Sequence, residues 1–154
     1  MSDAAAAVDF TLLLAQKPDD TVRPEPLPPG TYRARVKKYT TGVSSQKKTP
    51  YVEMIFGGFQ PEADVDQEAW GRWNTGERLA KAELSEEFYI TDSALFRLKD
   101  FLEDVMGIST TGRSYADCLS ETPNMEVLLS VGQVISTKDN KTVYAEIKGI
   151  AKAA

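Results

Sequence analysis

With 154 residues, of which 42% are hydrophobic and 27% are charged, the chain has the composition of a soluble globular protein with one buried core. Its net charge of -5 argues against a strong general affinity for duplex DNA, because neutralising a duplex backbone requires clustered cations. The chain contains no histidine and a single cysteine, Cys118. This composition excludes a catalytic nucleophile activated by histidine, an intramolecular disulfide, and a zinc site made of cysteine and histidine.

No stretch approaches the roughly 18 apolar residues that a membrane-spanning helix requires. The N-terminus lacks the basic start of a signal peptide, since its first basic residue is Lys17. We therefore expect a cytoplasmic protein without a membrane partner.

Residues 1–28 are predicted to form a flexible N-terminal arm rich in alanine and proline. Five prolines between residues 18 and 30 cannot join a regular sheet, because proline lacks the amide donor. Ala4–Ala7 and Phe10–Leu14 could each form a short helix or an added strand, and the second of these could pack on the domain or on a neighbouring subunit. Residues 29–154 are assigned to one domain.

A basic β-hairpin is predicted from Gly30 to Gln60. Apolar residues alternate with basic residues at the start of its first strand, so the two kinds of side chain lie on opposite faces. The second strand is predicted over Pro50–Phe56, after a polar turn. Basic residues outnumber the one acidic residue, Glu53, by six to one. These six are Arg33, Arg35, Lys37, Lys38, Lys47 and Lys48.

The next segment, Pro61–Trp73, is acidic at its start and is interpreted as a loop or short helix too polar to belong to the core. A third strand is predicted over Leu79–Ile90, where Ala80, Ala82 and Leu84 alternate with charged residues.

An amphipathic helix follows, because leucine and valine recur at spacings of three and four residues. These residues are Leu95, Leu98, Leu102 and Val105. Thr91, Asp92 and Ser93 supply capping oxygens before the helix, and Gly107 supplies its stop. A further helical turn is predicted over Tyr115–Leu119.

Two final strands are predicted over Met125–Thr137 and Thr142–Ala151, joined by a turn at residues 138–141. The chain is thus mainly β, with five strands and one helix between the third and fourth. This order favours a closed five-stranded barrel of the oligonucleotide-binding (OB-fold) type, because closure removes open edges. An open sheet carrying one helix would use the same order.

The basic hairpin also predicts a binding surface for single-stranded nucleic acid, which a positive groove and stacking aromatic rings would hold. The candidate residues are Arg33, Arg35, Lys37, Lys38, Tyr39, Lys47, Lys48, Tyr51, Trp70, Arg72 and Trp73. Other interpretations remain open. The basic residues could be the solvated face of an edge strand, Tyr32 and Tyr51 could belong to the core, and the tryptophans could cover the barrel mouth or form a subunit interface.

No enzyme motif for phosphate, dinucleotide or zinc chemistry is present. Two acidic clusters, one at Glu62, Asp64, Asp66 and Glu68 and one at Glu83, Glu86 and Glu87, are best explained as solvated surface. A metal-dependent nuclease using Glu62, Asp64 and Asp66 is a minor alternative. We expect a protein that is not an enzyme and that has no cofactor or bound metal.

Four sequence segments resemble the small phage-encoded single-stranded DNA-binding proteins of the OB-fold. These segments, with x for unmatched positions, are PxGTYRARV, SxxKKTPYVEMIF, FYITxSALxRLKDFLEDVMGI and YAEIKGIA, and the resemblance covers roughly residues 28–152. It implies a protein that coats single-stranded DNA in the host bacterial cytoplasm during phage replication or recombination. The positions that match the binding strands are Arg33, Arg35, Lys37, Tyr39, Lys47, Lys48 and Tyr51.

The partners implied are single-stranded DNA, further copies of the chain, and phage replication or recombination proteins. The basic ending IKGIAKAA departs from the acidic tail that many such proteins carry, so recruitment through a tail is not expected. The choice between DNA and RNA stays open. The alternative function is that of a structural or assembly protein, such as a virion component, that does not bind DNA.

Overall fold

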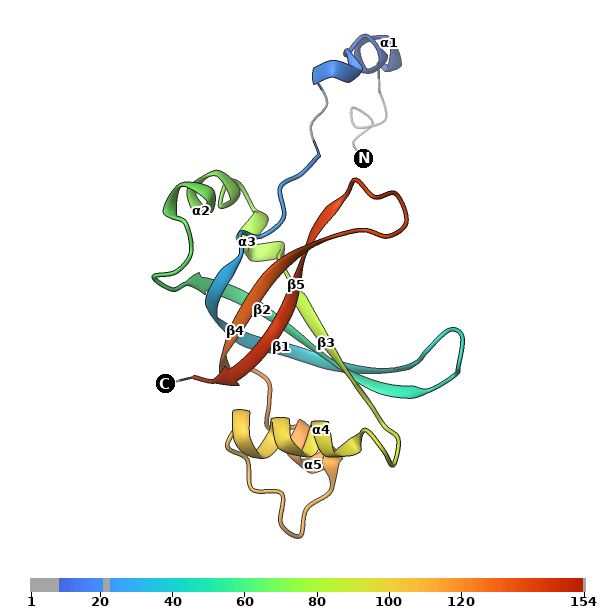
Figure 1. The fold of residues 1–154 in the computed structure, drawn as a ribbon, viewed down its shortest axis with the longest axis vertical. Coiled ribbons are helices and arrows are strands. Elements are labelled where there is room, and N and C mark those ends of the chain that lie inside the picture. The colour runs from blue at the N-terminus through green and yellow to red at the C-terminus, as the bar shows by residue number, and fades with distance from the viewer. Residues whose placement is uncertain (1–8, 21–22, 154) are drawn as a thin grey trace, which may run out of the picture.

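A computed structural model describes residues 9–20 and 23–153 and contains one five-stranded antiparallel sheet, in the order β3-β2-β1-β4-β5 (Figure 1). The strands are β1 (Gly30–Val43), β2 (Pro50–Pro61), β3 (Leu84–Tyr89), β4 (Glu126–Ile135) and β5 (Val143–Lys152). β1 is central and pairs with β2 on one side and β4 on the other. The predicted mainly β fold with five antiparallel strands is therefore confirmed.

The two edge strands, β3 and β5, approach one another without pairing. Some of their Cα atoms come within 8 Å, but no hydrogen-bonded ladder joins them in the described part of the chain. The sheet is strongly coiled and is not closed by hydrogen bonds, so a seam runs between its two edges.

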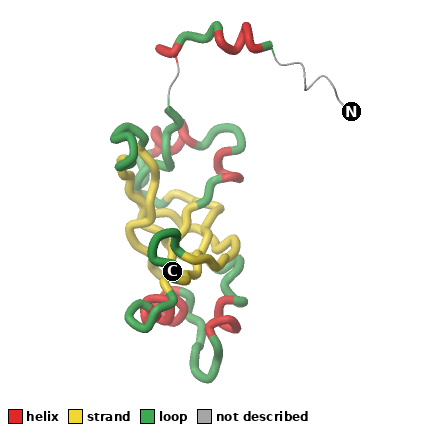
Figure 2. Tube along the Cα trace, turned by 90° about the vertical axis from the view of Figure 1, so that its right-hand side faces the viewer, coloured by secondary structure: helices red, strands yellow, loops and turns green. Residues whose placement is uncertain are grey.

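Short helices lie at both ends of the sheet, as Figures 1 and 2 show. At one end are α2 (Gln67–Trp73) and α3 (Arg78–Lys81), which follow β2. At the other end are α4 (Leu95–Asp100), its π-helical continuation η3 (Phe101–Val105), and α5 (Tyr115–Leu119), all between β3 and β4. Nearer the N-terminus, the 3-10 turn η2 (Pro18–Asp20) follows α1 (Phe10–Leu14).

The predicted amphipathic helix forms as α4 and η3, with Leu98 and Leu102 fully buried. Gly107, at φ +68°, follows its last turn, as expected of a helix stop. The predicted side-chain cap is wrong, because the N-cap is Ala94 and makes no capping bond. The third predicted strand is wrong in its first part, since Arg78–Lys81 is helical and the strand begins only at Leu84. The predicted turn at Tyr115–Leu119 is confirmed as α5.

The core lies inside the coiled sheet and beneath α4 and η3. Its largest fully buried side chains include Tyr32, Phe56 and Phe59 from the strands. Burial of an aromatic hydroxyl requires a partner, and the Tyr32 hydroxyl donates to the Pro28 carbonyl at 2.6 Å. Burial, aided by the nearby Asp64 carboxylate, raises the pKa of Tyr32, so this ring stays neutral. Leu27 is also buried, so the end of the proline-rich segment contributes to the core.

Two aspartates hold the backbone at the start of β1 and at the β4–β5 turn. Asp64 accepts hydrogen bonds from the amide and hydroxyl of Thr31 at 2.9 and 2.8 Å. Asp139 accepts from the Thr142 hydroxyl at 2.6 Å and from the amides of Lys141 and Thr142 at 2.9 Å. The bonds from Thr31 lower the pKa of Asp64, and those from Thr142 and Lys141 lower the pKa of Asp139.

We expect these two carboxylates to make the protein sensitive to acid. Because their pKa values are lower in the folded protein, the unfolded chain binds more protons as the pH falls below their ordinary value of 3.8. The stability that they provide is therefore full above that pH and is lost as the pH falls through the folded pKa values. Urea unfolding between about pH 6 and pH 2.5 should show a smaller decrease for Asp64→Asn/Asp139→Asn than for the wild type. An equal decrease in both proteins would contradict this assignment.

Candidate nucleic-acid interface

The β1–β2 hairpin extends beyond the neighbouring strands and presents its turn to solvent (Figure 1). The turn is held by backbone bonds from Ser44 N to Thr49 O at 2.9 Å and from Lys48 N to Ser44 O at 3.1 Å. The Ser44 hydroxyl also accepts from Thr49 N at 2.9 Å. The exposed side chains of Lys47 and Lys48 therefore project from an ordered turn.

A pair of tyrosines lies beside this turn. Tyr51 on β2 is opposite Tyr89 on β3, and their rings meet edge to face with centroids 6.3 Å apart. The Tyr51 ring also covers Gly42, where an added Cβ would lie 2.6 Å from the tyrosine hydroxyl oxygen. Tyr89 is 36% exposed, so the pair offers an aromatic edge at the surface.

Three hairpin lysines, Lys38, Lys47 and Lys48, are exposed and make no ion pair with any residue in the described ranges 9–20 and 23–153. Their charges are therefore not neutralised by neighbouring carboxylates. Next to the turn lies a cavity of about 500 Å³ whose lining includes Lys47, Thr49, Tyr89 and Thr91. One cation, several hydroxyl groups and an aromatic ring thus meet at one place.

The basic residues nearer the start of β1 are instead paired with carboxylates. Arg33 lies 3.4 Å from Glu126 and 3.9 Å from Glu62, and Arg35 lies 3.3 Å from Glu126.

Two further candidate cations are also paired. The Lys37 side chain crosses Gly57 to reach Glu83 at 3.3 Å. Arg72 pairs with Glu25 at 3.4 Å. These four candidate residues are present at the surface, but each already has an acidic partner.

The other candidate aromatic residues lie away from the hairpin turn. Tyr39 on β1 is directly opposite the buried Met54 on β2, and its side chain is partly buried against the core. Trp70 stacks on Trp73 with ring centroids 5.4 Å apart and also contacts Tyr32 at 5.9 Å.

The expected exposure of the tryptophan segment is wrong for Trp73, which is only 5% exposed. Val65 from the same segment is also buried, so Pro61–Trp73 contributes to the core despite its polar composition. Two acidic residues of this segment accept hydrogen bonds from backbone amides. Asp64 holds Thr31, and Asp66 accepts from Glu68 N at the start of α2.

A strongly acidic surface borders the tyrosine pair. Glu53 and Glu87 are direct partners across β2 and β3, and they line a cavity of about 610 Å³ together with Glu83, Glu86 and Glu146. Partial burial raises the pKa of Glu86, although Arg97 at 3.8 Å opposes this rise. This surface would repel a polyanion, so a nucleic-acid strand would have to keep to the turn end of the hairpin, where Lys47 and Lys48 lie.

Sequence reasoning missed Tyr89 and Gly42. Tyr89 follows the buried Phe88 and so faces the opposite side of β3, a signal that strand alternation contains. Its pairing with Tyr51 depends on the β2–β3 register, which local sequence does not contain.

No model of a known protein family and no curated protein matches this chain. Among the described residues, no helix is long and apolar enough to span a membrane. No group of three or more cysteine, aspartate or glutamate side chains in the same ranges is placed to hold a metal ion.

Proposed function

We propose that this protein binds single-stranded nucleic acid, with DNA as the ligand, and that it does so without catalysis. The observation that carries the proposal is the group of three exposed lysines without ion pairs to described residues on the β1–β2 hairpin, Lys38, Lys47 and Lys48. Of these, Lys47 lines a cavity together with Tyr89 of the Tyr51–Tyr89 pair, and Lys38 lies farther along β1, opposite Ile55. Single strands are held by cations that follow the phosphates and by aromatic rings on which bases stack, each stack being worth about 1–3 kcal/mol. We call this group the hairpin site.

The strand arrangement supports the proposal. Joining β3 to β5 would give every strand two neighbours and make a five-stranded barrel, and OB-type barrels are often partly open. We propose that the sheet is an open barrel of this type. In such barrels the loop between the first two strands takes part in binding oligonucleotides, and here that loop carries Lys47 and Lys48.

The paired cations of β1 have a secondary role in this proposal. Arg33, Arg35 and Lys37 would have to exchange carboxylates for phosphates, so each would add little net attraction. The proposed role in phage replication or recombination rests on the sequence resemblance described above.

Salt dependence tests the proposal directly. Fluorescence anisotropy of a labelled oligo-dT of about 30 bases should report binding that weakens as salt rises from about 50 to 300 mM. Three phosphate contacts predict a slope of about -2 for the logarithm of the binding constant against the logarithm of salt concentration. Duplex of the same length should compete poorly. Absence of binding at the lowest salt concentration would contradict the proposed function.

A further inference from the structure

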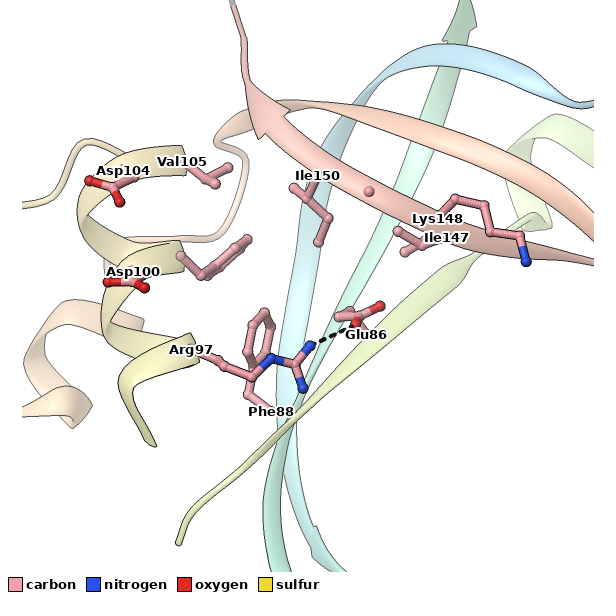
Figure 3. Close-up of a pocket in the computed structure, with 11 residues that line it drawn as sticks. Glu86, Phe88, Arg97, Asp100, Asp104, Val105, Ile147, Lys148 and Ile150 are labelled. Carbon is pink, nitrogen blue, oxygen red and sulfur yellow. Dashed lines mark ion pairs between the residues drawn. The ribbon is translucent and has the colours of Figure 1, made fainter. Parts of the chain in front are cut away.

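The seam between β3 and β5 contains an apolar groove, which Figure 3 shows in close-up. It is a cavity of about 380 Å³ between the two strands and η3. Its apolar lining comes from all three elements and consists of Phe88, Phe101, Val105, Ile147 and Ile150. Charged side chains border it, with Arg97, Asp100 and Asp104 on the helical side, Glu86 on β3 and Lys148 on β5. Arg97 pairs with Glu86 at 3.8 Å, and Lys148 pairs with Glu146 at 2.8 Å.

The same chain carries an apolar segment whose side chains are exposed in the described part of the structure. Helix α1 has only five residues and no buried side chain, and its Phe10, Leu12 and Leu14 are 66%, 70% and 80% exposed. Asp9 caps it by accepting from Thr11 N at 3.0 Å and Leu12 N at 3.3 Å. So short a helix is marginal in water, and contiguous exposed apolar residues usually mark a contact surface.

We infer that α1 of one copy occupies the seam groove of a second copy. The segment and the groove match in kind, because each has an apolar centre with a charge at one end. In the segment this charge is Lys17, which follows α1. At the groove it is that of Asp100 and Asp104 on the helical border, which make no ion pair with any described residue and would face Lys17.

The contacts that attach the N-terminal segment to the domain explain why α1 would occupy the groove of another copy and not its own. Arg23 donates to the Thr142 hydroxyl at 2.9 Å, and the Leu27 carbonyl accepts from Gln133 at 3.1 Å. Both contacts lie toward the β4–β5 turn, whereas the groove adjoins η3 at the opposite end of the sheet (Figure 1). α1 therefore leaves the domain at the end away from its own groove. Successive copies joined in this way would form a chain that does not depend on the proposed nucleic-acid binding.

The first test compares the mass of the protein in solution by light scattering over a range of concentrations. The wild type should exceed the mass of a single chain at high concentration, and Leu12→Asp/Leu14→Asp should stay a monomer with an unchanged melting temperature. Val43→Asp/Ile135→Asp is the matched control, because it places the same two charges at exposed apolar residues on β1 and β4 and should associate like the wild type. A wild type that is monomeric throughout, or an arm variant that still associates, would overturn the inference.

A charge exchange tests the groove itself. Lys17→Glu alone and Asp104→Lys alone should each weaken self-association by about two- to fivefold, the range of an exposed ion pair. The protein that carries both changes should regain most of the loss, because opposite charges again face one another. If self-association of the double variant is weakened by as much as the two single changes together predict, α1 does not occupy this groove.

Discussion

Lys47→Glu/Lys48→Glu is expected to lower the affinity for single-stranded DNA at least about tenfold at low salt. Both side chains project from the ordered hairpin turn, and no carboxylate in the described residues neutralises them. The change removes two phosphate contacts and replaces them with repulsion. Anisotropy titrations should therefore also show a shallower salt dependence, by about 1.4 in the logarithmic slope.

The control for this change is Lys138→Glu/Lys141→Glu in the β4–β5 turn, where both side chains are also exposed. This variant has the same net charge as the hairpin variant, so a purely global electrostatic effect would weaken both proteins equally. Equal losses in the two variants would show that the hairpin site is not the binding surface. Both proteins should unfold at the wild-type temperature, because the altered lysines lie at the surface.

Gly30→Ala is expected to reduce the free energy of unfolding by about 2–4 kcal/mol, the sum of backbone strain and overpacking. Gly30 has φ +139°, and a Cβ there would lie 2.6 Å from Val65 Cγ2 and 3.2 Å from Val65 Cα. Val65 is buried and cannot move freely. The adjoining Thr31 is held by Asp64, so the start of β1 is fixed on both sides. Chemical denaturation measures this loss.

Substitutions at two other glycines distinguish the cost of backbone strain from the cost of steric overlap with Val65. Gly58 has φ +66° with no atom within 4 Å of an added Cβ, so Gly58→Ala should cost only the strain, about 1–2 kcal/mol. Gly71 lies in α2 with open space around it, and Gly71→Ala should stabilise the protein by about 0.5–1 kcal/mol. If Gly30→Ala costs no more than Gly58→Ala, contact with Val65 does not constrain the start of β1.

Strand alternation predicted the hairpin correctly but misplaced part of its surface. The β1–β2 register shifts between Val36 and Lys38, so Tyr39 falls in the row of the buried Met54. Tyr51 lies on the other face, over Gly42. A bulge of this kind turns a side chain to the opposite face, and the local alternation of residues does not reveal it.

The ion pairs of the basic strand could not be predicted from local sequence. Arg33 lies 93 residues from its partner Glu126, and Lys37 lies 46 residues from Glu83. Such pairs form only after β4 and β3 have taken their places in the sheet. Charge counting along the hairpin therefore overestimated the cations that are free to meet phosphates.

Spacing predicted the long helix well, because Leu98 and Leu102 recur on one face and become buried there. The burial of Trp73 was missed because it depends on tertiary packing, which overrides the polarity of the local sequence. The segment around Trp73 is polar in composition, yet Trp73 stacks on Trp70, which in turn contacts Tyr32.

The sheet order has a consequence for how the chain folds. β2 and β3 connect to β1 through neighbouring segments, and β4 and β5 form a hairpin of their own. In the described residues, the single ladder between these two halves runs from the Gly30–Val131 pair to the Arg35–Glu126 pair. Formation of this ladder brings together residues more than 90 positions apart. It therefore costs more chain entropy than formation of either hairpin does. We therefore expect the halves to form early and their docking to limit the folding rate.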